Sequence, residues 1–369
     1  MIRVFEPRLS FADKYTVFKA ISKNQISGTS TYVKEFEDKF ANYSNRKFGI
    51  AVSNGSVALD VALHLLDLEE GDEVIVPSHT IISCLAAILR TKAKPIFCDV
   101  DPNSWNMTIE NVKKEFTKKT KAVIVVHTFG LPADVSSISD FCNENNIYLI
   151  EDAAEAHGQK ENNKICGSFG NISTFSFYAN KHLTTGEGGM ILTNSDDLYK
   201  KALQIRNLDF TKERFKHENL YWNYRLSGIQ AALGISQIDK IDKVIKDKRK
   251  QGLTYLEILS NNDDLFQLPL NENNGSLNHF WVFGILLKKD NIRDKVIEEL
   301  LKKGIETRPF FWPLHLQPLL QKFDITPKNI LPVSEKLGKN GLYIPLGRHI
   351  SQKNQRYICK SLIDLVKNL

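Results

Sequence analysis

Short apolar segments alternate with longer segments of helical pattern from about residue 48 onward. The apolar segments are rich in β-branched and aromatic residues, which is typical of buried strands. The connections between them, such as 56–66 and 135–143, are long enough to form helices. Alternating strands and helices predict βαβ units, and therefore a mostly parallel, seven-stranded sheet in an α/β fold. The expected strands are Phe48–Val52, Glu73–Val76, Pro95–Asp99, Ala122–His127, Tyr148–Glu151, Thr174–Tyr178 and Gly189–Thr193.

The pattern changes after residue 228. A lysine-rich helical stretch continues to about Leu259, turn-forming residues follow, and 280–287 is expected to be a strand. Further helices are expected near 293–303 and 352–367. We therefore predict two domains, a large α/β domain over residues 1–240 and a smaller α+β domain over 241–369, with the lysine-rich helix as their connector.

Composition is that of an ordinary soluble protein, with 42% hydrophobic and 25% charged residues. The net charge of +6 comes from 49 basic and 43 acidic residues that are scattered along the chain. Short basic clusters such as 246–250 are more typical of a solvated helix face than of a nucleic-acid site, so no nucleic-acid partner is expected. A modest positive field would still favour anionic substrates such as nucleotide diphosphates or keto acids.

The cysteines indicate a reducing compartment. They number five, lie far apart and form no Cys-x-x-Cys pair, which argues against a disulfide framework and against a zinc site. No metal is expected. The amino terminus lacks the apolar core of a secretion signal, and no apolar run approaches the ~20 residues that cross a bilayer. The expected location is the cytoplasm.

Lys181 and Asp152 carry the main candidate chemistry. Lys181 follows an apolar strand and precedes the glycine-rich turn Gly186-Glu-Gly-Gly189, which makes it a candidate Schiff-base amine. Asp152 ends another apolar strand, and strand ends of an open α/β sheet face a common ligand crevice. Pyridoxal phosphate (PLP) needs an amine for its aldehyde and an acidic partner for its ring nitrogen. The pair therefore suggests PLP as the cofactor.

A phosphate site is expected where Asn54, Gly55 and Ser56 open an apolar helix. Free backbone N–H groups and the positive end of the helix dipole meet there, although such residues are often only a helix cap. The Ser176 hydroxyl could donate to the same phosphate. Glu155 and His157 could support the cofactor ring, or they could be a helix-start carboxylate and a buried structural histidine.

The order of these motifs resembles the DegT/DnrJ/EryC1/StrS aminotransferases over nearly the whole chain. The motifs are 53–56 (SNGS), 74–80 (VIVPSHT), 151–158 (EDAAEAHG), 175–181 (FSFYANK), 185–189 (TGEGG), 223–234 (NYRLSGIQAALG), 308–315 (RPFFWPLH) and 341–345 (GLYIP). The last two especially resemble the family members that make GDP-perosamine.

The resemblance implies the aspartate-aminotransferase-like fold of PLP enzymes, known as fold type I. It implies that Lys181 is the catalytic lysine bound to PLP, that Asp152 pairs with the pyridine nitrogen, and that Gly55, Ser56 and Ser176 hold the phosphate. Asn223 would reach the phosphate in the neighbouring subunit's site. A homodimer with shared active sites is therefore implied.

Three further positions on the small domain are implied to line the substrate site: Arg308, Phe310 and His315. A structural turn with aromatic packing is the alternative for this segment. Ile81 stands where the family usually has an aromatic residue that stacks on the cofactor, so it would pack by dispersion instead. Ser30 stands where the family commonly has glycine. Related dehydratases have histidine in place of the lysine, so Lys181 favours transamination.

Our hypothesis at this point is amino transfer from L-glutamate to a nucleotide-linked 4-keto-6-deoxy sugar, with GDP-4-keto-6-deoxymannose favoured and Lys181 moving the proton. A UDP- or dTDP-linked keto sugar, or a small phosphorylated ketone, is the alternative substrate. From a different class of protein, a non-catalytic PLP-binding regulator would use the same fold to sense a metabolite. An intact Lys181 and Asp152, without a DNA-binding motif, argue against a regulator.

Overall fold

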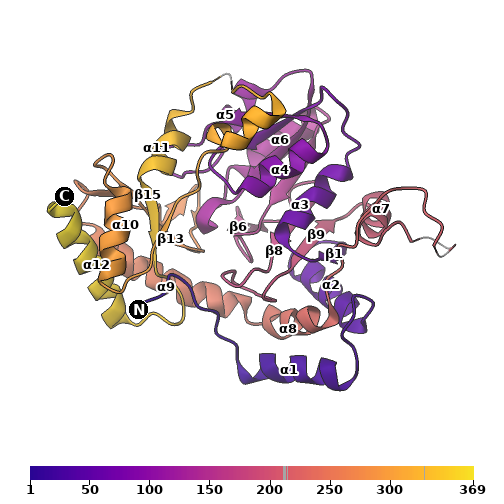
Figure 1. Ribbon diagram of the computed structural model, residues 1–369, viewed down its shortest axis with the longest axis horizontal. Helices are drawn as coiled ribbons and strands as arrows, with labels where there is room; N and C mark the ends of the chain where they lie inside the picture. Colours follow the sequence, from indigo (N-terminus) through magenta and orange to yellow (C-terminus); the bar gives the residue numbers. More distant parts are fainter. Residues whose placement is uncertain (211–212, 214, 328) are drawn as a thin grey trace.

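A seven-stranded sheet is the centre of the computed structural model, which describes residues 1–210, 213, 215–327 and 329–369 (Figure 1). Its strand order is β1-β9-β8-β5-β4-β2-β3, and every neighbouring pair is parallel except the two that involve β9. The strands are β1 (Phe48–Val52), β2 (Glu73–Pro77), β3 (Lys94–Cys98), β4 (Thr120–Val126), β5 (Tyr148–Asp152), β8 (Ile172–Ser176) and β9 (Gly189–Thr193).

Helices cover both faces of this sheet because alternate strand residues point to opposite sides. Val74 and Val76 pack against one set of helices, whereas Ile75 between them packs against another. On the first face lie α3 (Gly55–His64), α4 (Ile82–Arg90) and α7 (Asp196–Arg206). On the second lie α2 (Thr31–Tyr43), α5 (Ile109–Glu115), α6 (Val135–Glu144) and α8 (Gly228–Ile238).

A second, antiparallel sheet of four strands lies in the carboxyl-terminal third, with the order β10-β13-β15-β14. Its apolar residues share a core with the long helices beside it in Figure 1. The elements are α9 (Ile241–Leu259), β10 (Phe266–Gln267), β13 (Phe283–Leu287), α10 (Arg293–Lys302), β14 (Arg308–Pro309), α11 (Pro332–Asn340), β15 (Gly341–Ile344) and α12 (Gln352–Lys367).

Short elements complete the described chain. Two small hairpins pair β6 (Lys160–Glu161) with β7 (Lys164–Ile165), and β11 (Glu272–Asn273) with β12 (Ser276–Leu277). Three 3₁₀ turns are η1 (Thr128–Gly130), η2 (Leu314–Leu316) and η3 (Pro318–Phe323). In the part of the chain that the structure describes, no helix is both long enough and apolar enough to cross a membrane.

The seven expected strands are all confirmed, each within two residues of its predicted ends. The amino-terminal helices α1 (Phe11–Ser22) and α2 were not predicted, and neither was β15. The first residues lie against the second sheet, because Ile2 forms a parallel bridge with Ile305, while α1 packs on α8. The division into domains at residue 240 stays a prediction, although α9 begins at the next residue.

Candidate active site

A cleft of about 480 Å³ opens at the carboxyl ends of the parallel strands. Ligands of open α/β sheets bind at this edge because the strands end there and helices begin. Eight of the predicted site residues line it: Asn54, Gly55, Ser56, Ile81, Asp152, Glu155, Ser176 and Lys181. Residues that were not predicted also line it, among them Thr80, Ser83, Tyr178, Asn180, Glu187, Trp281, Phe311 and Tyr343.

Lys181 is part of this lining, with only 9% of its side chain exposed. Its Nζ lies 3.8 Å from the centroid of the Trp281 ring and 3.9 Å from Oε1 of Glu155. Burial lowers the pKa of Lys181, although the carboxylates of Glu155 and Asp152 oppose that shift. A lysine in these surroundings is more readily a neutral nucleophile or base than an exposed lysine.

Asp152 ends β5, and it is buried at 3% exposure. It accepts hydrogen bonds from the Ala154 backbone N–H at 3.1 Å and from the Cys84 thiol at 3.6 Å. Burial raises the pKa of Asp152 above its ordinary value, with Ala154 and Lys181 opposing the shift. A buried carboxylate with so few partners is stabilised by a cation brought into the cleft.

Glu155 is the second buried carboxyl of the cleft. Burial raises its pKa to about 7, while Lys181 and the Phe129 backbone N–H oppose the shift. That N–H donates to Oε2 at 2.8 Å. Phe129 has φ +61°, in the left-handed region that a bulky residue rarely adopts, so Glu155 also stabilises a strained turn.

The start of α3 forms the opposite end of the cleft. The Asn54 side chain accepts from the Val57 N–H at 2.9 Å and so caps the helix. Within the described chain, the N–H groups of Gly55 and Ser56 have no acceptor, as is usual for a first helical turn. A Cβ on Gly55 would come within 2.8 Å of the Ser176 Cβ, so glycine lets the helix start lie against β8. Free amides beside two serine hydroxyls suit a phosphate.

The loop that carries Lys181 is fixed by hydrogen bonds on both sides. The Phe177 N–H donates to Gly188, and the Thr185 N–H donates back to the Phe177 carbonyl. His157 ties this loop to β8, since its Nε2 lies 3.0 Å from the Ser176 carbonyl and its Nδ1 accepts from the Leu183 N–H. His157 is therefore the buried structural histidine of the two alternatives.

The candidate residues from the carboxyl-terminal third lie elsewhere in this chain. Arg308 is exposed and pairs with Glu306 at 2.8 Å. Phe310 is buried among Trp105, Phe129 and His79. His315 is buried, and its Nδ1 is 2.6 Å from the Ser78 hydroxyl. None of the three lines the cleft as described, and their substrate role stays a prediction.

Asn223 also lies outside its own chain's cleft lining. It forms a backbone bridge with Asn207, and its side-chain oxygen accepts from the Arg225 guanidinium at 2.8 Å. A role in a neighbouring subunit stays a prediction.

A cluster next to Asp152 could be mistaken for a metal site. Ligand atoms of His127, Glu151 and Cys166 lie within 4.8 Å of one another, and all three residues are buried. However, His127 pairs with Glu151 at 2.9 Å, and Glu151 also accepts from three backbone N–H groups of residues 167–170. These donors and acceptors already engage one another, so the cluster has a structural role in supporting the end of β5.

Comparison with known proteins identifies the family. The model of the DegT/DnrJ/EryC1/StrS aminotransferase family matches residues 11–363. The chain belongs to this family. The chain is therefore a PLP-dependent sugar aminotransferase, and the resemblance drawn from the sequence is confirmed.

Individual relatives narrow the comparison. A GDP-perosamine synthase of Escherichia coli O157:H7 is 38% identical over 98% of this chain and 97% of its own length. One of Vibrio cholerae is 35% identical over 98% of both chains. A GDP-4-keto-6-deoxymannose-3-dehydratase solved with bound GDP-perosamine is 26% identical, with a TM-score of 0.90 over 98% of this chain and 100% of that chain. The fold of these enzymes is therefore confirmed.

The cleft fits the cofactor of the family. PLP carries a phosphate, an aldehyde and a pyridine nitrogen, and the cleft offers a suitable group for each: free helix amides, a buried amine and a buried carboxylate. Ile81 caps the start of α4 with 41% of its surface exposed at the cleft, where a flat ring could pack on it. These residues support the predicted contacts of the cofactor.

Proposed function

We propose that this chain transfers the amino group of L-glutamate to a nucleotide-linked 4-keto-6-deoxy sugar, with GDP-4-keto-6-deoxymannose as the favoured substrate and GDP-perosamine as the product. The observation that supports this most strongly is the buried amine of Lys181 in a cleft that Asp152 also lines, in a chain whose relatives over 98% of its length bear the name GDP-perosamine synthase. The dehydratase neighbour with bound GDP-perosamine supports the same sugar chemistry.

Lys181 would move the proton of the reaction. When PLP is bound it supplies an electron sink for the carbon that carries the amino group. Burial lowers the pKa of Lys181, so its Nζ is more readily neutral than that of an exposed lysine and could accept a proton from one carbon and return it to another. Asp152 would pair with the protonated pyridine nitrogen of the cofactor, and the backbone amides of Gly55 and Ser56 would orient its phosphate. Trp281, packed against Nζ, would limit the access of water.

A panel of keto substrates tests this proposal. Purified protein loaded with PLP is incubated with glutamate and GDP-, UDP- or dTDP-linked 4-keto-6-deoxy sugars, or with a small phosphorylated ketone, and 2-oxoglutarate release is measured. Preferential turnover of GDP-4-keto-6-deoxymannose is expected. Turnover restricted to another substrate would replace the favoured sugar with that alternative, and failure with all of them, together with an unaltered cellular role of a Lys181→Ala variant, would favour the regulator.

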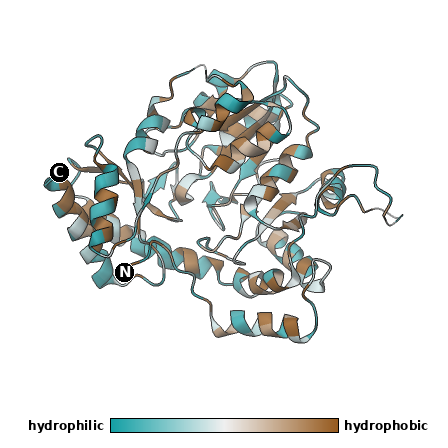
Figure 2. Cartoon of the chain, in the orientation of Figure 1, coloured by the Kyte–Doolittle hydropathy of each residue, from teal (hydrophilic) through white to brown (hydrophobic). Residues whose placement is uncertain are grey.

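We also propose a cytoplasmic homodimer with shared active sites. Large hydrophobic residues of α1 are exposed, namely Phe11 and Phe18 at 83% and 64%, and Figure 2 shows apolar residues along this outlying helix. Leu220, three residues before Asn223, is 93% exposed. A row of exposed apolar residues such as that of α1 is typical of a surface that a partner covers.

Subunit mixing tests the shared site. Lys181→Ala and Asn223→Ala subunits should each be inactive or weakly active as homodimers. A mixed dimer would contain one intact site if Asn223 acts across the interface, so random mixing should restore about a quarter of wild-type activity. No recovery, with mixed dimers demonstrated, would contradict sharing through Asn223.

A further inference from the structure

Trp281 contacts the Lys181 amine with the face of its indole ring. Nζ of Lys181 lies over this ring, 3.8 Å from its centroid, and Trp281 is only 5% exposed. A cation within about 6 Å of an aromatic centroid is attracted to the electron-rich face, and indole attracts it more strongly than the rings of Phe or Tyr. Burial favours the neutral amine of Lys181, whereas the ring favours its ammonium form. The ring therefore provides part of the stabilisation that water gives to an exposed ammonium group.

Trp281 is held by hydrogen bonds at all three of its polar groups. Its backbone N–H donates to the Phe129 carbonyl at 3.0 Å, and its indole N–H donates to the Asn180 carbonyl at 3.2 Å. Its own carbonyl accepts from Nζ of Lys248 at 2.8 Å. The ring also lies beside the Phe129 ring, with centroids 6.4 Å apart and an angle of 26° between the planes. These contacts leave the indole little freedom to turn away from Lys181.

The backbone around this contact is strained. Phe129 and Phe280 have φ values of +61° and +50°, in the left-handed region that bulky residues rarely adopt. A Cβ on Gly130 would lie 2.6 Å from the backbone nitrogen of Trp281, so glycine is needed where the two segments approach. Strain of this kind is retained where the position of a side chain matters for function. Here the strained residues fix the position of Trp281.

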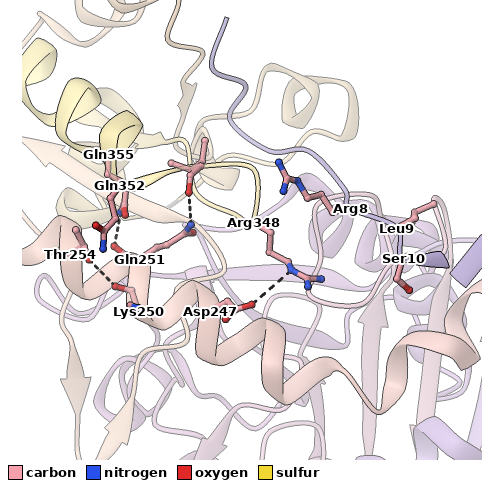
Figure 3. A pocket seen from close by; sticks show the side chains of 11 residues that line it. Arg8, Leu9, Ser10, Asp247, Lys250, Gln251, Thr254, Arg348, Gln352 and Gln355 are labelled. Carbon is pink, nitrogen blue, oxygen red and sulfur yellow. Dashed lines mark hydrogen bonds and ion pairs between the residues drawn. The ribbon is translucent and has the colours of Figure 1, made fainter. Parts of the chain in front are cut away.

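Lys248 reaches Trp281 from a helix that is itself fixed. Lys248 is buried on α9, and Gln251 lies about one turn further along the same helix. The side-chain amide of Gln251 donates to the carbonyls of Gly347 and Ile350, both at 2.9 Å. Figure 3 shows Gln251 reaching from α9 toward this loop, which precedes α12. Lys248 therefore anchors the Trp281 carbonyl from a rigid part of the carboxyl-terminal third.

The titratable groups that interact with Lys181 are two carboxyl groups, one amine and two imidazoles. They are Glu155, Asp152, Lys248, His157 and His182. The carboxylates favour the ammonium form of Lys181, whereas the charges of the two lysines repel each other. Burial lowers the pKa of both histidines, so they are neutral near pH 7. A change in the electrons of the indole ring alters none of these groups, and its effect on Lys181 can therefore be measured separately.

We propose that Trp281, anchored by Lys248, is a positioning residue for Lys181 whenever this lysine is not bonded to the cofactor. The face of the indole ring holds the ammonium form of Lys181, and in this way it keeps the amine beside Glu155 and inside the cleft. Lys181 also takes the ammonium form after it accepts the proton of the reaction, so the ring stabilises the proton carrier without exchanging a proton itself. This inference rests on the proposed role of Lys181 and is independent of which keto sugar is the substrate.

Fluorinated tryptophans at residue 281 test the inference. Fluorine withdraws electrons from the indole face and weakens its attraction for a cation, while the shape of the ring and its N–H group stay almost unchanged. Tryptophan with an increasing number of fluorine atoms is incorporated at this position by stop-codon suppression. Cofactor-free protein is then mixed with PLP, and the rate of imine formation is followed by absorbance at several pH values. This rate reports the neutral amine of Lys181, because only the neutral amine reacts.

Each added fluorine should move the pH profile to lower pH, because the ammonium form becomes less stable relative to the neutral amine. Across the series the proton affinity of Lys181 should fall about threefold to tenfold, which lowers its apparent pKa by about 0.5 to 1. The same series at Trp312, an exposed tryptophan outside the cleft lining as described, is the matched control and should leave the profile unchanged. A profile that fluorination at residue 281 leaves in place, or moves to higher pH, would overturn the inference.

Fluorine NMR of the monofluorinated protein tests the anchor. Lys248→Met removes the hydrogen bond to the Trp281 carbonyl, so the fluorine signal of residue 281 should change its chemical shift and broaden. Lys246→Met, on an exposed face of α9, is the control and should leave the signal as it is in wild type. An unchanged signal in Lys248→Met would show that Lys248 does not hold the ring.

Failure of the inference and failure of the proposed role of Lys181 give different results. Borohydride trapping of the imine shows which lysine has reacted. If PLP is trapped on Lys181 and the pH profile does not respond to fluorination, only the inference is overturned. If PLP is trapped on another lysine, the proposed role fails and the inference fails with it.

Discussion

The two walls of the cleft differ in how they are built. The sheet wall consists of residues that end strands or begin helices, such as Asp152, Ser176 and Gly55. Local hydrogen bonds fix Asp152 and Ser176, and the side chain of Asn54 caps the helix that Gly55 begins. The opposite wall consists of aromatic residues, with Trp281 and Phe311 from irregular segments and Tyr343 from β15. The first wall supplies charge and hydrogen bonds to the cofactor, and the second supplies shape. Substitutions in the two walls should therefore have different consequences.

The largest effect is expected at Lys181. Lys181→Ala should lower transamination at least about 10³-fold, because both the amine that binds the cofactor and the proton carrier are lost. Single-turnover absorbance with glutamate measures the effect. Lys246→Ala, on an exposed face of α9, is the matched control and should retain activity. Comparable activity in Lys181→Ala would contradict the assignment.

Asp152→Asn should have the next largest effect on the sheet wall. A neutral amide cannot pair with a protonated ring nitrogen, so kcat/KM should fall about 10²-fold. Cofactor-free protein should respond in the opposite sense, because the buried carboxylate is destabilised in its charged form. Its free energy of unfolding should rise by about 1 kcal/mol in the variant, measured by urea denaturation. A loss of both activity and apo stability would indicate a structural role instead.

Neighbouring phenylalanines provide a test within the aromatic wall. Phe310 is 4% exposed and packs 4.7 Å from the Phe129 ring centroid, whereas Phe311 lines the cleft. Phe310→Leu should lower the free energy of unfolding by about 1 to 2 kcal/mol. Phe311→Leu should instead raise KM for the keto substrate by about threefold to tenfold with a smaller change in stability. The reverse pattern would restore Phe310 as the substrate-facing residue.

A pH test examines His157, which links the loop of Lys181 to β8. Burial lowers the pKa of His157 from 6.5 to about 3. Between these values the unfolded chain binds a proton that the folded chain does not, so stability is full above about pH 6.5 and falls as the pH drops toward 3. One such histidine contributes a slope of about 1.4 kcal/mol per pH unit.

Denaturation of wild type and His157→Gln at several pH values between about 7 and 5 measures this slope. The free energy of unfolding of the variant should change less steeply with pH, by the equivalent of about one bound proton. This difference is expected whatever the absolute stability of the variant. Other buried histidines, such as His79 with a pKa of about 3, contribute equally to both proteins. Identical slopes would show that His157 is not held in its neutral form by burial.

The smallest effect is expected at Ile81, which lines the cleft where the cofactor ring is expected to lie. Ile81→Tyr restores an aromatic residue at a position with 41% exposure. Stacking on the ring should tighten PLP binding by about twofold to tenfold, since such contacts contribute about 0.5 to 1.5 kcal/mol. Ile81→Leu is the control and should change the affinity little. Weaker PLP binding in the tyrosine variant would show that the ring does not lie against this residue.

The sequence predicted the sheet wall well for a physical reason. A buried strand is a local apolar pattern, and the residue that follows it is placed at the ligand-binding edge by the topology alone. The place of Asp152 therefore follows from the end of its predicted strand. Gly55 and Ser56 are found in the same way, because they open the helix that follows β1. Ser176 was expected inside the strand Thr174–Tyr178, whereas β8 ends at Ser176.

The aromatic wall could not be predicted in the same way. Phe310 and Phe311 are identical neighbours, and only the packing of β15 decides which is buried, since a Cβ on Gly341 would lie 2.0 Å from the Phe310 ring. Trp281 lies just before β13, and its place over Lys181 depends on contacts between segments 100 residues apart. Arg8 and Arg348 line the same cavities although they are 340 residues apart, and the bridge between Ile2 and Ile305 holds the amino-terminal segment against the carboxyl-terminal third. Such long-range contacts leave no local pattern in the sequence.

The central claim is that Lys181 is the amine that binds the cofactor, and chemical trapping tests it most directly. Lys248 is the main competitor, because it lines a cavity that Lys181 also lines, and burial lowers its pKa to about 7. Protein loaded with PLP is treated with borohydride, digested and mapped by mass spectrometry. The account predicts a pyridoxyl group on Lys181 and none on Lys248. A group on Lys248, or on any lysine outside the cleft, with Lys181 unmodified, would contradict it.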